Sequence, residues 1–349
     1  MPSARIQATK GLNMPNKIRV GIGFRVSDEV ITQIEAVDPN LEAVPLFGLS
    51  SSSRVWSDGS PEDREALLRD VATVDILFGP GGIPGEFLRA ATNLKWFQVI
   101  NAGVDRLHTE GLLGLGYKVT NVSGLTAASI AEYVLGSMIM FTKGMHTAMR
   151  NQAEHKWLRT GSVGELAGTT CGIAGMGAIG RETAIRARAM GMRIVATRRT
   201  VMAGDADPDC DVLLPFSENA RLLEQSDFVV LCVPLTPETH HLIGAPELDL
   251  MKRTACLINI ARGEVVDQDA LIAALREGTI AGAILDVTVP EPLGPDSALW
   301  DLPNAIVTPH ISGSISGYGH RSAEMFIANL RRYIAGEALH QLVDPQLGY

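Results

Sequence analysis

The chain has 349 residues, enough for two domains, and its 46% hydrophobic and 20% charged residues are ordinary for a globular protein with large cores. Its net charge of −9 argues against nucleic acid as the main partner. No apolar run is long enough to span a membrane, and the first residues lack the apolar segment of a secretory signal, so we expect a cytoplasmic protein with no membrane partner.

The four cysteines form no C-x-x-C pair, and three of them lie inside apolar runs. This distribution is typical of buried thiols in a reducing compartment. We therefore expect neither a disulfide framework nor a metal site.

The first part of the chain alternates strands and helices, which is the pattern of a small parallel sheet. Residues 1–16 are polar and contain two prolines, which predicts a flexible extension. Strands are predicted at 18–24, 41–47, 74–78, 95–100 and 117–121, and helices at 28–37, 61–70 and 84–91. The third of these strands ends in glycines, and the N–H groups of Gly81 and Gly82 would form either a carboxylate nest or a plain turn.

Two consecutive helices are predicted next, at 127–145 and 146–158. Apolar residues extend almost all round the first helix, so we expect it to be buried between domains or between subunits. The second helix is more polar and includes Trp157.

A glycine motif follows these helices. Gly175, Gly177 and Gly180 form the spacing G-x-G-x-x-G between an apolar run at 171–174 and a predicted helix at 179–190. With the further apolar run after the helix, this is the context in which the spacing binds a dinucleotide; a glycine-rich turn without a ligand is the alternative. Gly175 would make the tight turn, Gly177 would let the backbone approach a pyrophosphate, and Gly180 would let the helix pack closely on the sheet.

The chain then continues as a second series of strands and helices. Strands are predicted at 171–174, 193–197, 228–232, 256–260, 281–285 and 305–308, with helices at 179–190, 217–224, 246–251 and 267–276. This is the count of a six-stranded, doubly wound, Rossmann-type parallel sheet. A last helix at 319–335 has no new sheet to cover, so we expect it to return to the first domain.

The predicted fold is therefore α/β, with a Rossmann-type domain and a second, smaller, flavodoxin-like domain that is discontinuous in sequence. The dinucleotide-binding domain is predicted at 124–312. The substrate domain is predicted at 17–123 and 313–349.

Polar residues follow several strands of the second series at the point where each strand ends. Arg262, Asp286, Glu291 and His310 all come after such strands, and ligands of doubly wound sheets bind beyond the carboxyl ends. Alone, the arginine could form a surface salt bridge, the glutamate could be a loop charge, and the histidine could be structural. Their convergence on the edge that carries the glycine turn favours a catalytic site.

The motifs, taken in order, resemble those of the D-isomer-specific 2-hydroxyacid dehydrogenases. They are WFQVINAGVDRL, IAGMGAIG, CVPLTPETHHLIG, LINIARGEVVD, LDVTVPEP and VTPHISG, together with Ala131-Glu132. The resemblance extends from about residue 75 to the C-terminus.

The resemblance implies hydride transfer between a nicotinamide cofactor and a 2-oxoacid or D-2-hydroxyacid. Arg262 would hold the substrate carboxylate and carbonyl oxygen with its planar fork. His310 would be the acid/base, and Glu291 would be the carboxylate that stabilises its imidazolium. The related formate dehydrogenases carry glutamine at the position of Glu291, so the glutamate in this sequence argues against that branch of the family.

The resemblance also implies further contacts. Asp286 would accept hydrogen bonds from the nicotinamide carboxamide, and Thr126 would lie near the nicotinamide. The other implied cofactor contacts are Val233, Pro234, Thr239 and Ile260. Gly81, Gly82 and Gly103 would help to hold the substrate carboxylate with their backbones.

The residues around the adenosine side bear on which dinucleotide is bound. The first N–H groups of the helix after the glycine turn, at Ala178 and Ile179, would face the pyrophosphate. Arg198 stands where an NAD-binding protein of this family has an acid, Arg199 follows it, and no carboxylate is close in the sequence. We therefore predict that NADP is preferred, with NAD possible; the alternative is that Arg198 stacks on the adenine of NAD.

The predicted function is reduction of a small 2-oxoacid of the glyoxylate or hydroxypyruvate type. Two alternatives remain: a phosphonate (phosphite) dehydrogenase that uses the same three residues, and a non-catalytic, nucleotide-sensing corepressor-like protein. The apolar helix at 127–145 predicts a homodimer, with an interdomain helix as the alternative. Trp157 is a candidate for an aromatic residue that enters the partner's active site.

Overall fold

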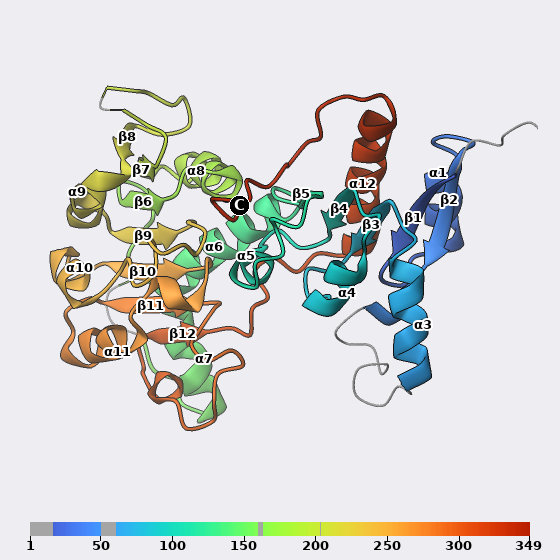
Figure 1. The fold of residues 1–349 in the computed structure, drawn as a ribbon. Coiled ribbons are helices and arrows are strands. Elements are labelled where there is room, and N and C mark those ends of the chain that lie inside the picture. Colours follow the sequence, from blue (N-terminus) through green and yellow to red (C-terminus); the bar gives the residue numbers. More distant parts are fainter. Residues whose placement is uncertain (1–16, 50–60, 160–162, 203) are drawn as a thin grey trace, which may run out of the picture. The chain divides into compact units, whose positions relative to one another are not determined.

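The computed structural model describes residues 17–49, 61–159, 163–202 and 204–349, and the chain divides into two compact units (Figure 1). The first unit comprises Met1–Val122 and Gly319–Gly348, and the second comprises Ser123–Tyr318 with Tyr349. The extension predicted at 1–16 lies outside the described residues.

The first unit contains a five-stranded parallel sheet in the order β2-β1-β3-β4-β5. Its strands are β1 (Ile18–Ile22), β2 (Leu41–Pro45), β3 (Ile76–Gly79), β4 (Trp96–Val99) and β5 (Lys118–Thr120). This is the flavodoxin-like order, so the predicted class of the smaller domain is confirmed. Its helices are α1 (Asp28–Glu35), α3 (Pro61–Val71), α4 (Gly85–Ala90), α5 (Asp105–Thr109) and α12 (Tyr318–Ile334).

Helix α12 packs on this first sheet, although some 200 residues separate them in the sequence. Phe326 is fully buried and stacks on Phe78 and Trp96, with ring centroids 4.4 and 5.3 Å apart. Aromatic stacking of this kind adds to the free energy gained by burial. The predicted return of the last helix to the first domain is therefore confirmed.

The second unit contains a seven-stranded parallel sheet in the order β12-β11-β10-β9-β6-β7-β8. Its strands are β6 (Thr170–Ala174), β7 (Arg193–Arg198), β8 (Val212–Pro215), β9 (Phe228–Leu231), β10 (Cys256–Asn259), β11 (Gly282–Leu285) and β12 (Ala305–Val307). Counted from β6, the first six follow the doubly wound order 3-2-1-4-5-6, and β12 extends the edge. The Rossmann-type class is confirmed.

The prediction of six strands was wrong because β8 was missed. This strand has four residues, ends in proline and pairs with β7 at the edge of the sheet. Proline cannot donate to a sheet ladder, so it is tolerated on an edge strand but weakens the sequence signal for a strand.

Helices surround the second sheet. They are α6 (Ala127–Thr142), α7 (Met145–Ala153), α8 (Ala178–Ala189), α9 (Asn219–Gln225), α10 (Ala245–Leu250) and α11 (Gln268–Glu277). Helix α6 buries Ile130, Val134 and Met138 in a cluster with Ala184 of α8, whereas its Glu132 is exposed. Within the second unit α6 is therefore buried on one face.

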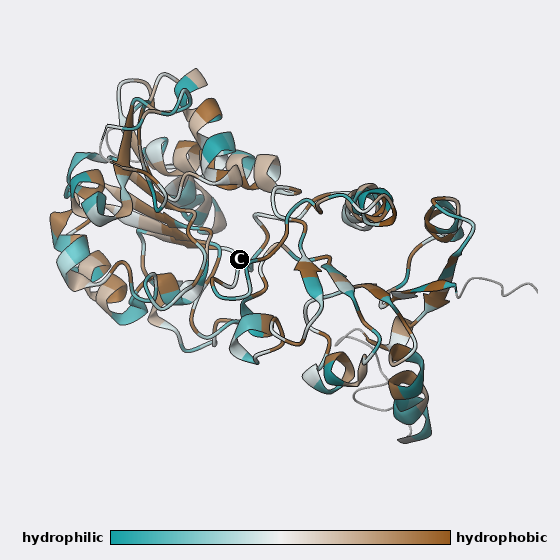
Figure 2. Cartoon of the chain, turned by 45° about the horizontal axis from the view of Figure 1, so that its top comes forward, coloured by the Kyte–Doolittle hydropathy of each residue, from teal (hydrophilic) through white to brown (hydrophobic). Residues whose placement is uncertain are grey.

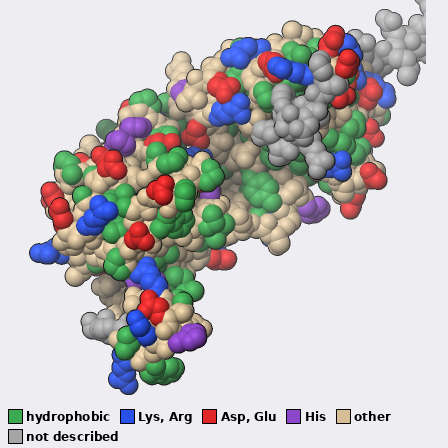
Figure 3. Space-filling model, turned by 90° about the horizontal axis from the view of Figure 1, so that it is seen from below, with side chains coloured by type: hydrophobic (Ala, Val, Ile, Leu, Met, Phe, Trp, Pro, Cys, Tyr) green, Lys and Arg blue, Asp and Glu red, His purple; other side chains and the backbone are tan. Residues whose placement is uncertain are grey.

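Figure 2 shows that the strands of the second sheet are mostly hydrophobic and that the helices around them carry hydrophilic residues as well. On the face shown in Figure 3, acidic and basic side chains are interspersed. Among the described helices, none is long and apolar enough to cross a membrane.

Candidate active site

The glycine turn between β6 and α8 combines two tight positions with one open position. Gly175 has φ 104°, and a Cβ built there would lie 2.8 Å from the carbonyl oxygen of Cys232. A Cβ on Gly180 would lie 2.3 Å from the carbonyl oxygen of Gly175, whereas a Cβ on Gly177 would meet nothing within 4 Å. Backbone geometry therefore requires two of the glycines, and the third leaves space in front of the helix.

The first turn of α8 faces that space without a side-chain cap. Gly177 is the N-cap residue and makes no side-chain hydrogen bond, so the first backbone N–H groups, which include those of Ala178 and Ile179, have no side-chain acceptor there. Unpaired N–H groups and the positive end of the helix dipole attract an anion such as a phosphate. The residues present therefore fit the pyrophosphate of a dinucleotide.

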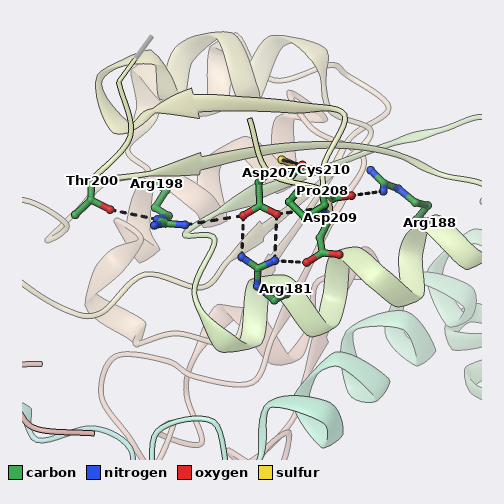
Figure 4. Close-up of polar contacts among 8 residues, drawn as sticks. All are labelled: Arg181, Arg188, Arg198, Thr200, Asp207, Pro208, Asp209 and Cys210. Carbon is green, nitrogen blue, oxygen red and sulfur yellow. Dashed lines mark hydrogen bonds and ion pairs between the residues drawn. The ribbon is translucent and has the colours of Figure 1, made fainter. Parts of the chain in front are cut away.

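Strand β7 ends at Arg198, whose Nε donates to Thr200 Oγ1 over 3.2 Å. No carboxylate is close to Arg198 in the sequence, but the segment between β7 and β8 brings Oδ2 of Asp207 to 3.9 Å from Arg198 Nη1 (Figure 4). Asp207 is nine residues further along the chain, and nothing in the spacing showed that the segment folds back.

Asp207 is mainly engaged by Arg181, the residue that follows the glycine motif. The guanidinium binds both carboxylate oxygens, at 3.1 and 2.7 Å, and also contacts Asp209. Hydrogen bonds from Arg181 lower the pKa of Asp207, whose side chain is only 7% exposed. The negative charge of Asp207 is therefore largely balanced, while Arg198 and Arg199 remain exposed.

The segment after β9 forms a closed turn. Thr239 Oγ1 donates to the carbonyl oxygen of Pro234 over 2.6 Å and accepts from the backbone of Thr236. Thr239 is buried, so its hydroxyl holds the turn together. Val233 is buried and Pro234 is exposed on the same turn.

The segment after β10 holds Arg262. The carbonyl oxygen of Arg262 accepts from Asn259 Nδ2 over 2.8 Å, and its Nη1 donates to the carbonyl oxygen of Ala261. A Cβ on Gly263 would lie 2.3 Å from the carbonyl oxygen of Thr288. The turn that carries the arginine therefore packs directly on the segment after β11. Ile260, which opens this turn, is buried.

His310 and Glu291 are in direct contact. His310 Nδ1 lies 2.6 Å from Glu291 Oε1, and the two side chains are 51% and 40% exposed. Because Nδ1 is engaged by the carboxylate, Nε2 is the ring nitrogen that remains for another partner. A histidine oriented in this way can donate or accept a proton at Nε2.

Asp286 lies under the His310 segment and is only 1% exposed. Its carboxylate accepts hydrogen bonds from Thr308 Oγ1 and from the backbone N–H groups of Ile311 and Ser312. Thr308 was placed at the end of the predicted strand and was not singled out, although it precedes Pro309-His310 directly.

The start of α6 adjoins the same segment. Thr126, its N-cap residue, makes no capping hydrogen bond, and its Oγ1 would lie 3.6 Å from a Cβ on Gly313. A Cβ on Gly124 would lie 3.8 Å from the Cβ of Ala178. The structure therefore brings Thr126 close to the His310 segment, and Gly124 close to the start of α8.

The glycines of the first unit form another group. The N–H of Gly81 donates to Asn101 Oδ1 over 2.8 Å, so it is not bare as expected, and the carbonyl oxygen of Gly82 accepts from Arg106. Gly103 is half-buried. Among the described residues, no group of three His, Cys, Asp or Glu side chains could hold a metal ion.

Comparisons with known proteins agree with this geometry. The family model described as D-isomer specific 2-hydroxyacid dehydrogenase, NAD binding domain, matches residues 135–312. The glyoxylate reductase of Korarchaeum cryptofilum is 36% identical over 323 residues, which cover 87% of this chain and 94% of that protein.

Solved structures are similar over nearly the whole chain. A D-isomer specific 2-hydroxyacid dehydrogenase family protein from Aeromonas salmonicida has a TM-score of 0.79 at 28% identity and covers 94% of this chain and 99% of its own. A D-isomer specific 2-hydroxyacid dehydrogenase from Xanthobacter autotrophicus, solved with NADPH and MES, has a TM-score of 0.79 at 30% identity and covers 96% and 100%.

The geometry of the glycine turn predicts that one alanine substitution lowers stability and that a matched one weakens dinucleotide binding. Gly175→Ala should destabilise the protein by about 1–3 kcal/mol, because the residue has a left-handed backbone and the new methyl group meets Cys232. Gly177→Ala should change stability by less than about 1 kcal/mol, because its backbone is extended and its Cβ has space. It should nevertheless weaken dinucleotide binding by about tenfold, or ~1.4 kcal/mol.

Thermal unfolding and titration with NADPH measure the two effects separately. Equal losses of stability in the two variants, or unchanged NADPH binding by Gly177→Ala, would contradict this account of the turn.

Proposed function

The chain belongs to the D-isomer specific 2-hydroxyacid dehydrogenase family and is an NAD(P)-dependent D-2-hydroxyacid dehydrogenase; from this premise we propose that it reduces a small 2-oxoacid of the glyoxylate or hydroxypyruvate type. The contact between His310 and Glu291, at the edge of the sheet that also carries Arg262 and the glycine turn, is the observation that carries the proposal. The name glyoxylate reductase, given to several relatives of the chain, supports this substrate class.

Arg262 binds the substrate in this proposal. Its planar guanidinium can hold a carboxylate and the adjacent carbonyl oxygen together, which a point charge such as lysine cannot do. When bound, the nicotinamide cofactor supplies the hydride. Arg262 also stabilises the negative charge that develops on the carbonyl oxygen during reduction.

His310 supplies the proton that this oxygen needs. Glu291 holds the ring at Nδ1 and stabilises the imidazolium, so Nε2 is the atom that donates the proton in reduction and accepts it in oxidation. The exposed fractions of both side chains leave room for substrate to approach. A general acid positioned in this way typically contributes a factor of about 10²–10⁴ to the rate.

The remaining roles rest on the resemblance and on local geometry. The second unit holds the dinucleotide, through the glycine turn and through Thr126, Val233, Pro234 and Ile260, and the first unit serves as the substrate domain. Asp286 has three donors already, which leaves it capacity for one further hydrogen bond from the nicotinamide carboxamide. Gly81, Gly82 and Gly103 remain proposed substrate contacts on the ground of the resemblance alone.

Substitution of the two central residues tests the proposed chemistry. Arg262→Ala and His310→Ala should each lower kcat/KM for glyoxylate by about 10²–10⁴, because one removes the anchor and the other removes the acid. NADPH binding should stay within about twofold of wild type in both. Arg276→Ala, on the exposed end of α11, is the matched arginine control and should retain wild-type activity.

The measurement is a spectrophotometric assay of NADPH oxidation with a panel of 2-oxoacids, with phosphite tested in the oxidative direction. Wild-type turnover in either variant would refute the assignment. Activity with phosphite and none with any 2-oxoacid would favour the phosphonate dehydrogenase alternative.

We also propose that NADPH is preferred over NADH. The exposed Arg198 and Arg199 can bind a 2′-phosphate, whereas Asp207 is nearly buried and is occupied by Arg181, so it is not presented to a ribose hydroxyl. The solved relative from Xanthobacter autotrophicus that contains NADPH supports the same preference.

Arg198→Ala should lower kcat/KM for NADPH by about 10–100-fold and leave the value for NADH nearly unchanged, because it removes a charge-assisted hydrogen bond worth ~1.5–3 kcal/mol. Arg193→Ala, at the other end of β7, is the control and should not change the ratio. A wild-type enzyme that prefers NADH tenfold would overturn the proposal.

A homodimer is the proposed assembly. Helix α7 buries none of its residues, and it presents Met145 and Met149 at 48% and 60% exposure, while Trp157 just beyond it is fully exposed. An apolar surface of this kind marks an interaction site in a protein with otherwise mixed charges. The same surface would let Trp157 reach a partner subunit.

Light scattering should give twice the monomer mass of 37.3 kDa for the wild type. Met149→Asp should shift the distribution toward the monomer, because it places a charge within the proposed interface. Leu115→Asp, an exposed apolar residue of the first unit, should leave it unchanged. A monomeric wild type at micromolar concentration would refute the homodimer.

A further inference from the structure

The backbone of His310 is held in an unfavourable conformation. Its φ is 53°, in the left-handed region that residues other than glycine rarely adopt. Such a conformation persists only when the surroundings over-determine it. The contacts that hold His310 in place are therefore part of what aims its ring at Glu291.

Asp286 provides these contacts on both sides of the histidine. Its backbone carbonyl oxygen accepts from the N–H of His310 over 2.9 Å. Its two carboxylate oxygens accept from the N–H groups of Ile311 and Ser312, over 2.8 and 2.9 Å. The orientation of this one buried carboxylate therefore fixes the path of the chain immediately after His310.

Thr308 and Tyr133 fix the carboxylate in turn. Thr308 Oγ1 donates to Asp286 Oδ1 over 2.6 Å, which uses its only hydroxyl proton. The hydroxyl of Tyr133, 2.6 Å from Thr308 Oγ1, must then be the donor in that second contact. Burial raises the pKa of Tyr133, so its hydroxyl keeps the proton that it donates.

We propose that Thr308 and Tyr133 are positioning residues of the catalytic histidine, and that they act through the carboxylate of Asp286 on the backbone that carries His310. Helix α6 thereby takes part in the active site through Tyr133, without touching the substrate. The inference rests on the proposed role of His310 as the acid/base.

Loss of the Thr308 hydroxyl would weaken the contacts that hold the backbone of His310. Without the Thr308 hydroxyl, Asp286 Oδ1 keeps a single donor, the N–H of Ile311, and the carboxylate can rotate. The left-handed backbone at His310 then loses a restraint, and the ring spends less time in contact with Glu291. Proton transfer slows, whereas Arg262, in the segment after β10, still binds the substrate.

Three variants test this chain of contacts in the intact enzyme. Thr308→Val replaces the hydroxyl by a methyl group of similar size and should lower kcat for glyoxylate reduction about tenfold, with KM for glyoxylate within about twofold of wild type. Thr308→Ser restores the hydroxyl and should bring kcat back to within about twofold. Tyr133→Phe removes the outer donor only and should lower kcat about threefold.

Circular dichroism and thermal melting establish that each variant is folded, and Tyr133→Phe tests the chain of contacts even if Thr308→Val does not fold. Wild-type kcat in Thr308→Val or in Tyr133→Phe would overturn the inference. So would a Thr308→Ser variant as slow as Thr308→Val, because the methyl group rather than the hydroxyl would then be required.

His310→Ala, assayed in parallel, separates this inference from the proposed function. If His310→Ala is inactive and Thr308→Val is fully active, the positioning chain is wrong and the acid/base assignment stands. If His310→Ala itself retains wild-type turnover, the acid/base assignment fails, and the inference fails with it.

Discussion

The parallel direction of every strand in the second sheet is the constraint on which the candidate site depends. Parallel strands deliver all their carboxyl ends to one edge, and the order that begins with β6 in the middle places the glycine turn between the two halves of the sheet. The turns after β10, β11 and β12 then lie side by side, which is how Arg262, Glu291 and His310 come to share an edge although almost fifty residues separate the first from the last. Close backbone packing supports this arrangement, since Gly263 lies so near Thr288 that no side chain would fit.

The two acidic residues at this edge, Glu291 and Asp286, differ in how far they are buried, and this difference determines how each contributes to the structure. Glu291 is 40% exposed and contacts a histidine that is 51% exposed, so their attraction is screened by water and contributes little to folding. The contact with Glu291 instead orients the imidazole ring of His310, which stays accessible to solvent. Asp286 is buried with three donors, so breaking its contacts would leave a charged group without partners, at a large cost in free energy. A buried, hydrogen-bonded acid thus lies beneath an exposed histidine–glutamate pair.

Much of the fold, and the common edge of the candidate site residues, could be predicted from the sequence because they depend on local patterns. Alternation of apolar runs with helical segments gave both sheets, and the position of Arg262, Glu291 and His310 after strands gave their common edge. The edge strand β8 was not predicted, because a four-residue run that ends in proline is too short to show the alternation of apolar and polar residues typical of a strand. The pairing of Arg181 with Asp207 was not predicted for another reason: it joins residues 26 apart, across the rest of α8, β7 and part of the connection to β8.

The role proposed for Thr308 could not be predicted either, because it depends on contacts between residues that are distant in the sequence. A residue that touches substrate must stand at a predictable place, beyond a strand end, because the ligand binds there. A residue that acts through another is constrained only by the contact it makes, and Thr308 and Tyr133 meet across 175 positions of the chain. Neither side chain is charged, and the VTPHISG motif that contains Thr308 directs attention to His310 instead. Only the direction of their hydrogen bonds toward a single buried carboxylate connects them to the histidine, and that direction follows from counting protons in the folded structure.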